Sequence, residues 1–196
     1  MVLRGEAEAI EKRLTGGHPN SLGNTIEVVD VVLADSQLVA PLLETYASED
    51  EVVRLRVSSA VKRVTEAHPE WMLPHLGRLQ GGIAQIDQAS TKWTQPKLYL
   101  ALWDLMDEGQ RERSKEIVMG NLEADDDWIV QNNSIEALTI WAGDDQDLRE
   151  WLKPRLELRS QDSRKSVAKR ASKALKVLTA TDGGGARPDA ELPSFR

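Results

Sequence analysis

The chain contains no cysteine among its 196 residues. This absence excludes disulfides, a thiolate nucleophile and thiolate metal ligands. The chain also has no apolar run near the roughly 18 residues that a membrane-spanning helix needs. Its first residues lack the apolar core of a signal peptide. From these absences we expect a cytoplasmic protein that makes no contact with a membrane.

Positive charge is scarce, because 25 Lys and Arg residues stand against 32 Asp and Glu residues, for a net charge of -7. Residues 1–160 carry a net charge of -11, whereas residues 161–196 carry +4. Proteins that bind nucleic acid need cationic surfaces to neutralise phosphates. The acidic charge of residues 1–160 therefore argues against a nucleic-acid partner. The main electrostatic feature of the chain is the contrast between this acidic part and the basic last helix.

Histidine is also rare, and the three histidines do not form a metal-ligand pattern. No pair has a tight spacing and none is followed by Glu, so we expect no metal. The acidic runs at 125–127 and 144–147 do not match a calcium loop. They precede predicted helices, where carboxylates cap backbone N–H groups. No phosphate-binding loop, nucleophile elbow or dinucleotide fingerprint occurs. We therefore predict no catalytic residue and no cofactor.

What the chain does have is a recurring arrangement of apolar and small residues at offsets of zero, four, seven and eight. This spacing places four side chains on one stripe of an α-helix. The small residue at the seventh offset allows a neighbouring helix to come close. The clear copies are Val53, Val57, Ala60 and Val61; Val130, Ser134, Ala137 and Leu138; and Val167, Ala171, Ala174 and Leu175. Weaker copies begin at Thr25 and Thr94.

A second pattern marks shorter helices between the first ones. It reads apolar, any, Pro or Gly, any, Leu. The copies are Val39–Leu43, Met72–Leu76, Val118–Leu122 and Leu152–Leu156. Proline is tolerated in the first turn of a helix and bends a helix where it lies deeper. Long and short helices therefore alternate, and two helices recur about every 40 residues, the spacing of HEAT-type repeats.

The sequence thus resembles a HEAT-repeat protein. Residues 50–79 and 126–156 carry the resemblance, with 162–178 as a terminal half-repeat. It implies an all-α fold, an α-α superhelix or HEAT-like solenoid of about four helix pairs plus a terminal helix. Repeats of this kind stack so that each pair covers the apolar face of the previous one. No His-Glu dipeptide is present, which argues against the HEAT-fold di-iron hydroxylases.

We divide the chain into three parts on this basis. Residues 1–19 are expected to form an N-terminal helix and linker, and residues 20–180 the HEAT-like repeat domain. Residues 181–196 have the composition of a flexible tail. Within the first repeat, the spacing predicts a helix after a cap at Asn20 or Ser21. Its expected apolar face carries Leu22, Ile26, Val29 and Leu33.

The resemblance also implies a function, because HEAT proteins commonly bind partners along the concave face made by their second helices. We therefore expect a non-enzymatic scaffold for protein–protein interaction, with a protein partner and an oligomeric state that the sequence leaves open. Lysines of the last helix either form a solvated face or dock onto an acidic partner or a second copy. The candidate partner-binding residues are Arg78, Arg111, Lys115, Arg149, Arg155, Lys165, Lys169 and Lys173.

The six tryptophans suggest one alternative function. Most of them fit an inter-helix core, and core is the preferred interpretation even for Trp93 and Trp128, which lie near helix starts. Some HEAT-like proteins, however, are DNA glycosylases that hold an alkylated base against tryptophans beside an aspartate. Trp103, Asp104 and Trp141 are the candidates for such a site. The acidic body disfavours this enzyme, which would need a cationic groove.

Overall fold

The computed structural model describes residues 2–18 and 21–182, and all regular secondary structure in this part of the chain is helical. The predicted all-α class is therefore confirmed. Contacts divide the chain into two compact units, residues 1–137 and 138–196. Of the predicted tail, residues 183–196 lie outside the described part of the chain. No helix among the described residues is both long and apolar enough to cross a membrane.

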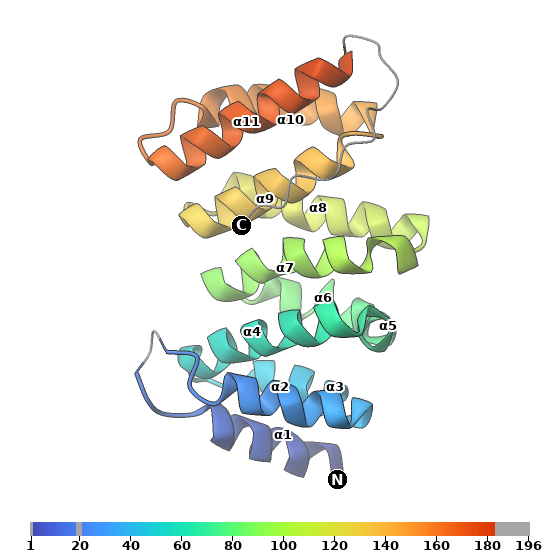
Figure 1. Ribbon diagram of the computed structural model, residues 1–196, viewed down its shortest axis with the longest axis vertical. Coiled ribbons are helices and arrows are strands. Elements are labelled where there is room, and N and C mark those ends of the chain that lie inside the picture. The colour runs from blue at the N-terminus through green and yellow to red at the C-terminus, as the bar shows by residue number, and fades with distance from the viewer. Residues whose placement is uncertain (1, 19–20, 183–196) are drawn as a thin grey trace. The chain divides into compact units, whose positions relative to one another are not determined.

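The first unit consists of long helices, short helices and brief 3-10 turns (Figure 1). The α-helices are α1 (Val2–Leu14), α2 (Thr25–Ala34), α3 (Val39–Glu44), α4 (Glu51–Ala67), α5 (Pro69–Met72), α6 (Leu76–Leu79), α7 (Ala89–Leu102), α8 (Glu108–Ala124) and the start of α9 (Trp128–Trp141). The 3-10 turns are η1 (Ser36–Leu38), η2 (Thr45–Ala47), η3 (Leu73–His75), η4 (Ile83–Gln85) and η5 (Trp103–Leu105).

The long helix α4 is the centre of the first unit, because it packs on both α2 and α7 (Figure 1). Its whole stripe of Val53, Val57, Ala60 and Val61 is inaccessible to solvent, as the offsets predict. Burial of such side chains contributes roughly 1.5 to 3 kcal/mol each for a valine. The stripe is therefore the main contribution of α4 to the core.

The helix α1 packs on the short helix α3, and α8 packs on α7. The prediction of a shorter helix around residues 118–122 is wrong, because α8 has 17 residues and α7 has 14. The predicted helix 70–80 exists, but it is split into α5, η3 and α6. Pro74 lies in η3, where its missing N–H removes an α-helical hydrogen bond. Proline thus explains the interruption of this second helix.

The prediction for the face of α2 is wrong for Leu22 and Ile26 but is confirmed for Val29, which is buried. The helix begins at Thr25, after Asn24, so Leu22 lies in the preceding turn. Leu22 and Ile26 are 42% and 47% exposed. The other buried residues are Thr25, Val28 and Val32. Four of the ten residues are valine, so apolar side chains occur all around the helix, and the contact with α4 decides which of them are covered.

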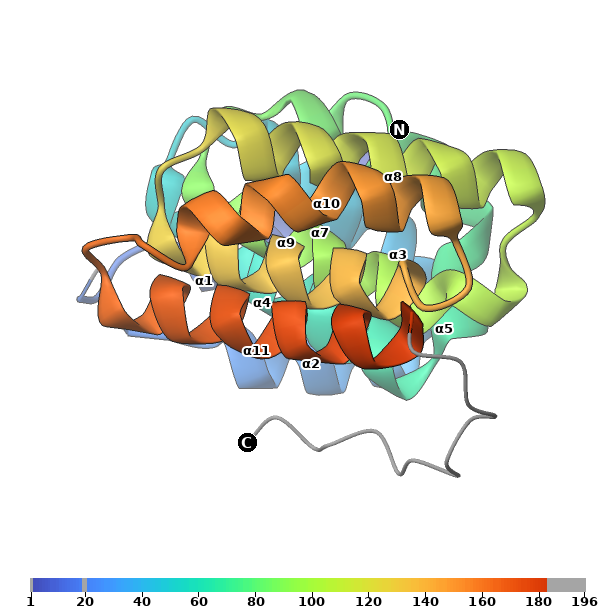
Figure 2. The ribbon, with the colours of Figure 1, turned by 90° about the horizontal axis from the view of Figure 1, so that it is seen from above.

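The second unit contains the last turn of α9 and two long helices, α10 (Gln146–Arg159) and α11 (Lys165–Asp182). These two helices pack side by side (Figure 2). They bury Leu148, Leu152 and Leu156 of α10 and Val167, Ala171, Ala174 and Leu178 of α11. Leu175 of the predicted stripe is half-buried, and Leu178 is fully covered.

Candidate partner-binding surface

The predicted cationic residues of the first unit each make contacts within their own unit. The guanidinium of Arg78 pairs with Glu44 at 3.1 Å, and Lys115 Nζ pairs with Glu112 at 2.6 Å. Arg111 donates from Nε to the carbonyl of Trp103 at 3.0 Å and lies 5.4 Å from the centre of that indole. The contacts of Arg78 and Arg111 join different elements, whereas the pair of Lys115 lies within α8. A role in partner binding stays a prediction.

The two predicted arginines of α10 have similar structural tasks in the second unit. Arg149 donates from Nε to the carbonyl of Ala142 at 3.0 Å and from Nη2 to that of Gly143 at 2.7 Å. It thereby satisfies carbonyls at the C-terminal end of α9, where a cation is favoured. Arg155 lies 3.9 Å from the centre of the Trp151 ring, a cation–π contact along its own helix.

The predicted lysines of α11 differ from these arginines, because their side chains are exposed. Lys165, Lys169 and Lys173 share one side of the helix with Lys176, which is exposed as well. This side is opposite the buried residues Val167 and Ala171, since residues four apart fall on one face. The last helix therefore presents a continuous cationic row to solvent.

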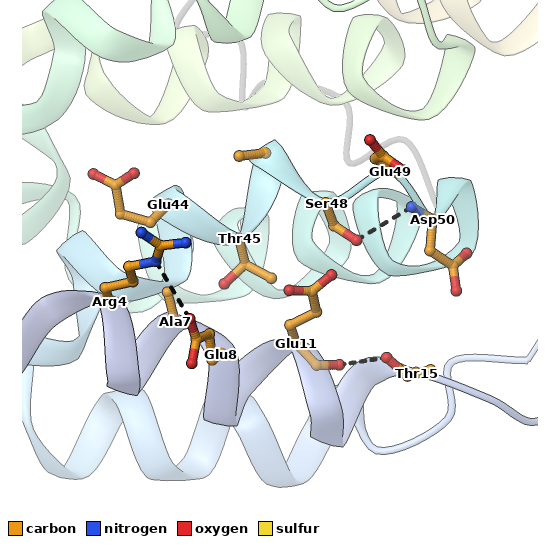
Figure 3. A pocket seen from close by; sticks show the side chains of 11 residues that line it. Arg4, Ala7, Glu8, Glu11, Thr15, Glu44, Thr45, Ser48, Glu49 and Asp50 are labelled. Carbon is orange, nitrogen blue, oxygen red and sulfur yellow. Dashed lines mark hydrogen bonds and ion pairs between the residues drawn. The ribbon is translucent and has the colours of Figure 1, made fainter.

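A hollow in the first unit lies between α1 on one side and α3, η2 and the start of α4 on the other (Figure 3). Its volume is about 870 Å³. Five of its eleven lining residues are acidic, and Figure 3 shows that they come from both sides of the hollow. The lining includes the carboxylates of Glu8, Glu11, Glu44, Glu49 and Asp50, together with Arg4. We call the space that these six residues line the acidic hollow.

The sequence produces this hollow through the two faces of α1. Ile10 and Leu14 are buried and hold the helix in place, while Glu8 and Glu11 lie three apart on an adjacent side. Arg4 pairs with Glu8 at 3.3 Å, but both side chains are mostly exposed, so the pair is worth little. The hollow therefore keeps an excess of negative charge.

On the opposite wall, backbone contacts fix the acidic residues that follow η2. The Oδ1 of Asp50 accepts a hydrogen bond from the backbone N of Val52 at 2.8 Å and caps α4. The hydroxyl of Ser48 accepts from the backbone N of Asp50 at 3.2 Å. The carboxylates of Glu44 and Glu49 are exposed. Glu44 also pairs with Arg78, so a cationic ligand would share that carboxylate.

A second, smaller hollow adjoins the first, because Glu44 lines both. Its volume is about 400 Å³, and its lining includes the apolar side chains of Leu43, Ile83 and Ile86. The Arg78–Glu44 ion pair belongs to this lining. An apolar hollow beside an acidic one suits a ligand that has both cationic and apolar side chains.

A third hollow of about 420 Å³ lies between the start of α7 and α8 and has mixed charge. Lys92 in its lining forms ion pairs with Asp87 at 2.5 Å and with Asp125 at 3.0 Å. The hydrogen bond to Asp87 is the main reason why the pKa of Lys92 is raised and the pKa of Asp87 is lowered. The charges of this hollow are thus neutralised internally.

The acidic capping interpretation is confirmed at two positions. Asp127 Oδ1 accepts from the backbone N of Ile129 at 2.7 Å and from that of Val130 at 3.1 Å. Asp145 Oδ1 accepts from the backbone N of Leu148 at 2.9 Å. Within residues 2–18 and 21–182, no group of three or more histidine or acidic residues is placed to hold a metal ion.

The tryptophans are not all in the core. Trp141 is buried, whereas Trp128 is 50% exposed, so the core interpretation of Trp128 is wrong. Its place as the first residue of α9 explains this exposure, because no preceding turn of the helix covers the ring. The ring of Trp103 is half-buried and has the guanidinium of Arg111 over it.

Sequence reasoning missed the acidic hollow. The spacing of Glu8 and Glu11 indicates that they share a side of α1, but nothing in the sequence shows that this side faces Glu44 and Glu49. In comparisons with protein-family models, curated proteins and solved structures, nothing matches the chain.

Proposed function

We propose that this protein is a non-enzymatic scaffold for protein–protein interaction with a HEAT-like arrangement of helix pairs. The packing of α4 between α2 and α7 supports this architecture. In such an arrangement the second helices of the pairs form the concave face, and residues of α1, α3 and α8 are among those that line the hollows of the first unit.

The observation that carries the proposal furthest is the acidic hollow. Five acidic residues and one arginine are among the eleven residues that line this hollow of about 870 Å³, and the apolar hollow beside it shares Glu44. A segment of a partner protein with positively charged and apolar side chains complements both hollows. Complementary charge of this kind accelerates association and excludes acidic competitors. We therefore assign the partner a basic, partly apolar segment.

The experiment measures binding of a dye-labelled peptide of alternating lysine and leucine by fluorescence anisotropy. The variant Glu8→Lys, Glu44→Lys and Glu49→Lys reverses three charges of the hollow. A control variant makes the same change in net charge at exposed positions outside the hollow. It combines Glu66→Lys, Glu123→Lys and Glu150→Lys. We expect binding to weaken about tenfold or more in the hollow variant, by loss of about 1.4 kcal/mol or more, and to change far less in the control.

Equal weakening in both variants would show that the peptide responds to net charge alone, and the proposed site would be wrong. The same variants then serve in affinity purification from cells. A partner that binds the hollow is recovered with the wild type and the control, and is lost with the hollow variant. The alternative of a DNA glycosylase gains no support from Trp103 or Trp141 and stays untested.

A further inference from the structure

The outward faces of α2 and α11 carry opposite charges next to exposed apolar side chains. On α2, Glu27 and Asp30 are exposed on the side away from the buried Val28 and Val32. Ile26 and Val31, 47% and 37% exposed, lie on either side of these acidic residues around the helix. We call these four residues the α2 face.

The α11 face is the cationic row of Lys165, Lys169, Lys173 and Lys176 together with Val177, which is 48% exposed. An exposed valine beside lysines is a common pattern at helix interfaces, where the apolar group packs and the lysine stems cover it. The α2 face belongs to the first unit and the α11 face to the second. The α2 face is acidic and the α11 face is basic, so their charges are complementary.

We infer that the α11 face of one molecule docks onto the α2 face of a second copy, so that the protein associates head to tail. In this contact the lysines of α11 meet Glu27 and Asp30, and Val177 packs against the apolar residues of α2. The inference uses surfaces outside the acidic hollow and so does not depend on the proposed partner.

The chemistry of the two faces sets the expected strength of this contact. A single pair of helices buries less than the roughly 1,200 to 2,000 Å² of a standard stable interface. Exposed charges are screened by salt over about 10 Å at 0.1 M ionic strength. The association is therefore weak, dependent on concentration and suppressed by salt. Because the contact joins two different faces, a dimer still exposes one α2 face and one α11 face. Further molecules can add to these faces, so oligomers larger than the dimer form unless a ring closes.

The test is sedimentation equilibrium of the full chain, from micromolar to millimolar concentrations, at low and at high salt. Two charge-reversal variants address the two faces separately. The first is Glu27→Lys with Asp30→Lys, and the second is Lys169→Glu with Lys176→Glu. We expect each variant alone to associate at least about tenfold more weakly than the wild type.

Mixing the two variants is the decisive step. In either pairing of the two variants, the α2 face of one and the α11 face of the other carry opposite charges. We expect the mixture to regain the association that each variant has lost. Leu158→Lys is a control at an apolar side chain that is 73% exposed on α10, outside both faces. Glu8→Lys with Glu49→Lys is the control for the acidic hollow. Both controls should associate as the wild type does.

A wild type that stays monomeric at low salt and millimolar concentration would overturn the inference. So would variants that associate normally, or a mixture that regains nothing. Loss of association in the hollow control, with the α2 variant unaffected, would overturn it too, because the lysines would then bind the hollow. None of these outcomes changes the result expected for the peptide, so failure here is distinct from failure of the proposed function.

Discussion

The backbone of Gly23 lies directly against the guanidinium of Arg56. A Cβ built on Gly23 would come within 2.8 Å of the Cζ of Arg56, and the φ angle of Gly23 is +51°. Arg56 belongs to α4 and is 1% exposed. Glycine thus allows the connection between α1 and α2 to fold over a buried charge.

The buried guanidinium is satisfied by main-chain carbonyls of this connection. Its Nε donates to the carbonyl of Ser21 at 3.1 Å, and Nη2 donates to that of His18 at 3.1 Å. Nη1 donates to the carbonyls of Leu14 and Gly16. Leu14 ends α1, so the positive charge also faces the negative end of the helix dipole. Arg56 therefore fastens the end of α1 to α4.

Replacing Gly23 with alanine should destabilise the protein by about 1 to 3 kcal/mol, since the new Cβ both clashes with Arg56 and strains the backbone. Chemical denaturation followed by circular dichroism measures the change. Gly120→Ala is the matched control, because Gly120 is inside α8 with open space around its Cα. That change should stabilise the helix by about 0.5 to 1 kcal/mol. A neutral Gly23→Ala would contradict the close approach.

Replacing Arg56 with methionine should cost about 3 kcal/mol or more, because several buried carbonyls lose their donor at once. Limited proteolysis should then cut the connection between α1 and α2 faster than in the wild type. Arg63→Met is the control on the same helix, since the guanidinium of Arg63 donates to Ser59 one turn away in α4. Equal stability of the two variants would show that Arg56 does not fasten α1.

Replacing Ala60 with leucine should destabilise the protein by about 1 to 3 kcal/mol, because overpacking forces side chains from their preferred rotamers. Ala60 occupies the seventh offset of the stripe in α4 and has no exposed surface. Thermal denaturation measures the effect. Ala9→Leu introduces the same side chain at an exposed position of α1 and should be close to neutral. A tolerated Ala60→Leu would mean that no helix packs tightly at this position.

The Asp162–Arg164 pair gives a prediction for pH. Arg164 donates from Nε to Oδ1 at 2.8 Å and from Nη2 to Oδ2 at 2.6 Å, and its backbone N also donates to Oδ1. These bonds lower the pKa of Asp162 from 3.8 to about 2. A lowered pKa in the folded state stabilises the protein above the ordinary pKa, and this contribution is lost as the pH falls from 3.8 towards 2.

Asp162→Asn should therefore lower the free energy of unfolding near neutral pH, and the difference from the wild type should shrink as the pH falls through this range. Urea denaturation at several pH values measures this difference in the free energy of unfolding. Glu150→Gln removes one charge from an exposed residue of α10 and controls for net charge. A difference that is constant over the whole range would show that the pair does not lower the pKa of Asp162.

The pattern of residues predicted much of the local structure. Val53, Val57, Ala60 and Val61 are all fully buried, as their offsets required, because side chains at these spacings share one side of any α-helix. The caps at Asp127 and Asp145 follow from chemistry within one turn. The candidate site could be predicted less well, because Arg78, Arg111 and Arg149 contact residues of other segments. Helical periodicity does not indicate which segments these are.

What the sequence determined alone was which side chains share a helical face and where most helices begin. The tertiary structure decided which face is covered, and so Val28 is buried in α2 while Ile26 is not. It also decided that Glu11 and Glu49 border one hollow and that the guanidinium of Arg56 meets Gly23. The reason is that helical periodicity acts over a few residues, whereas these contacts join segments that only packing brings together.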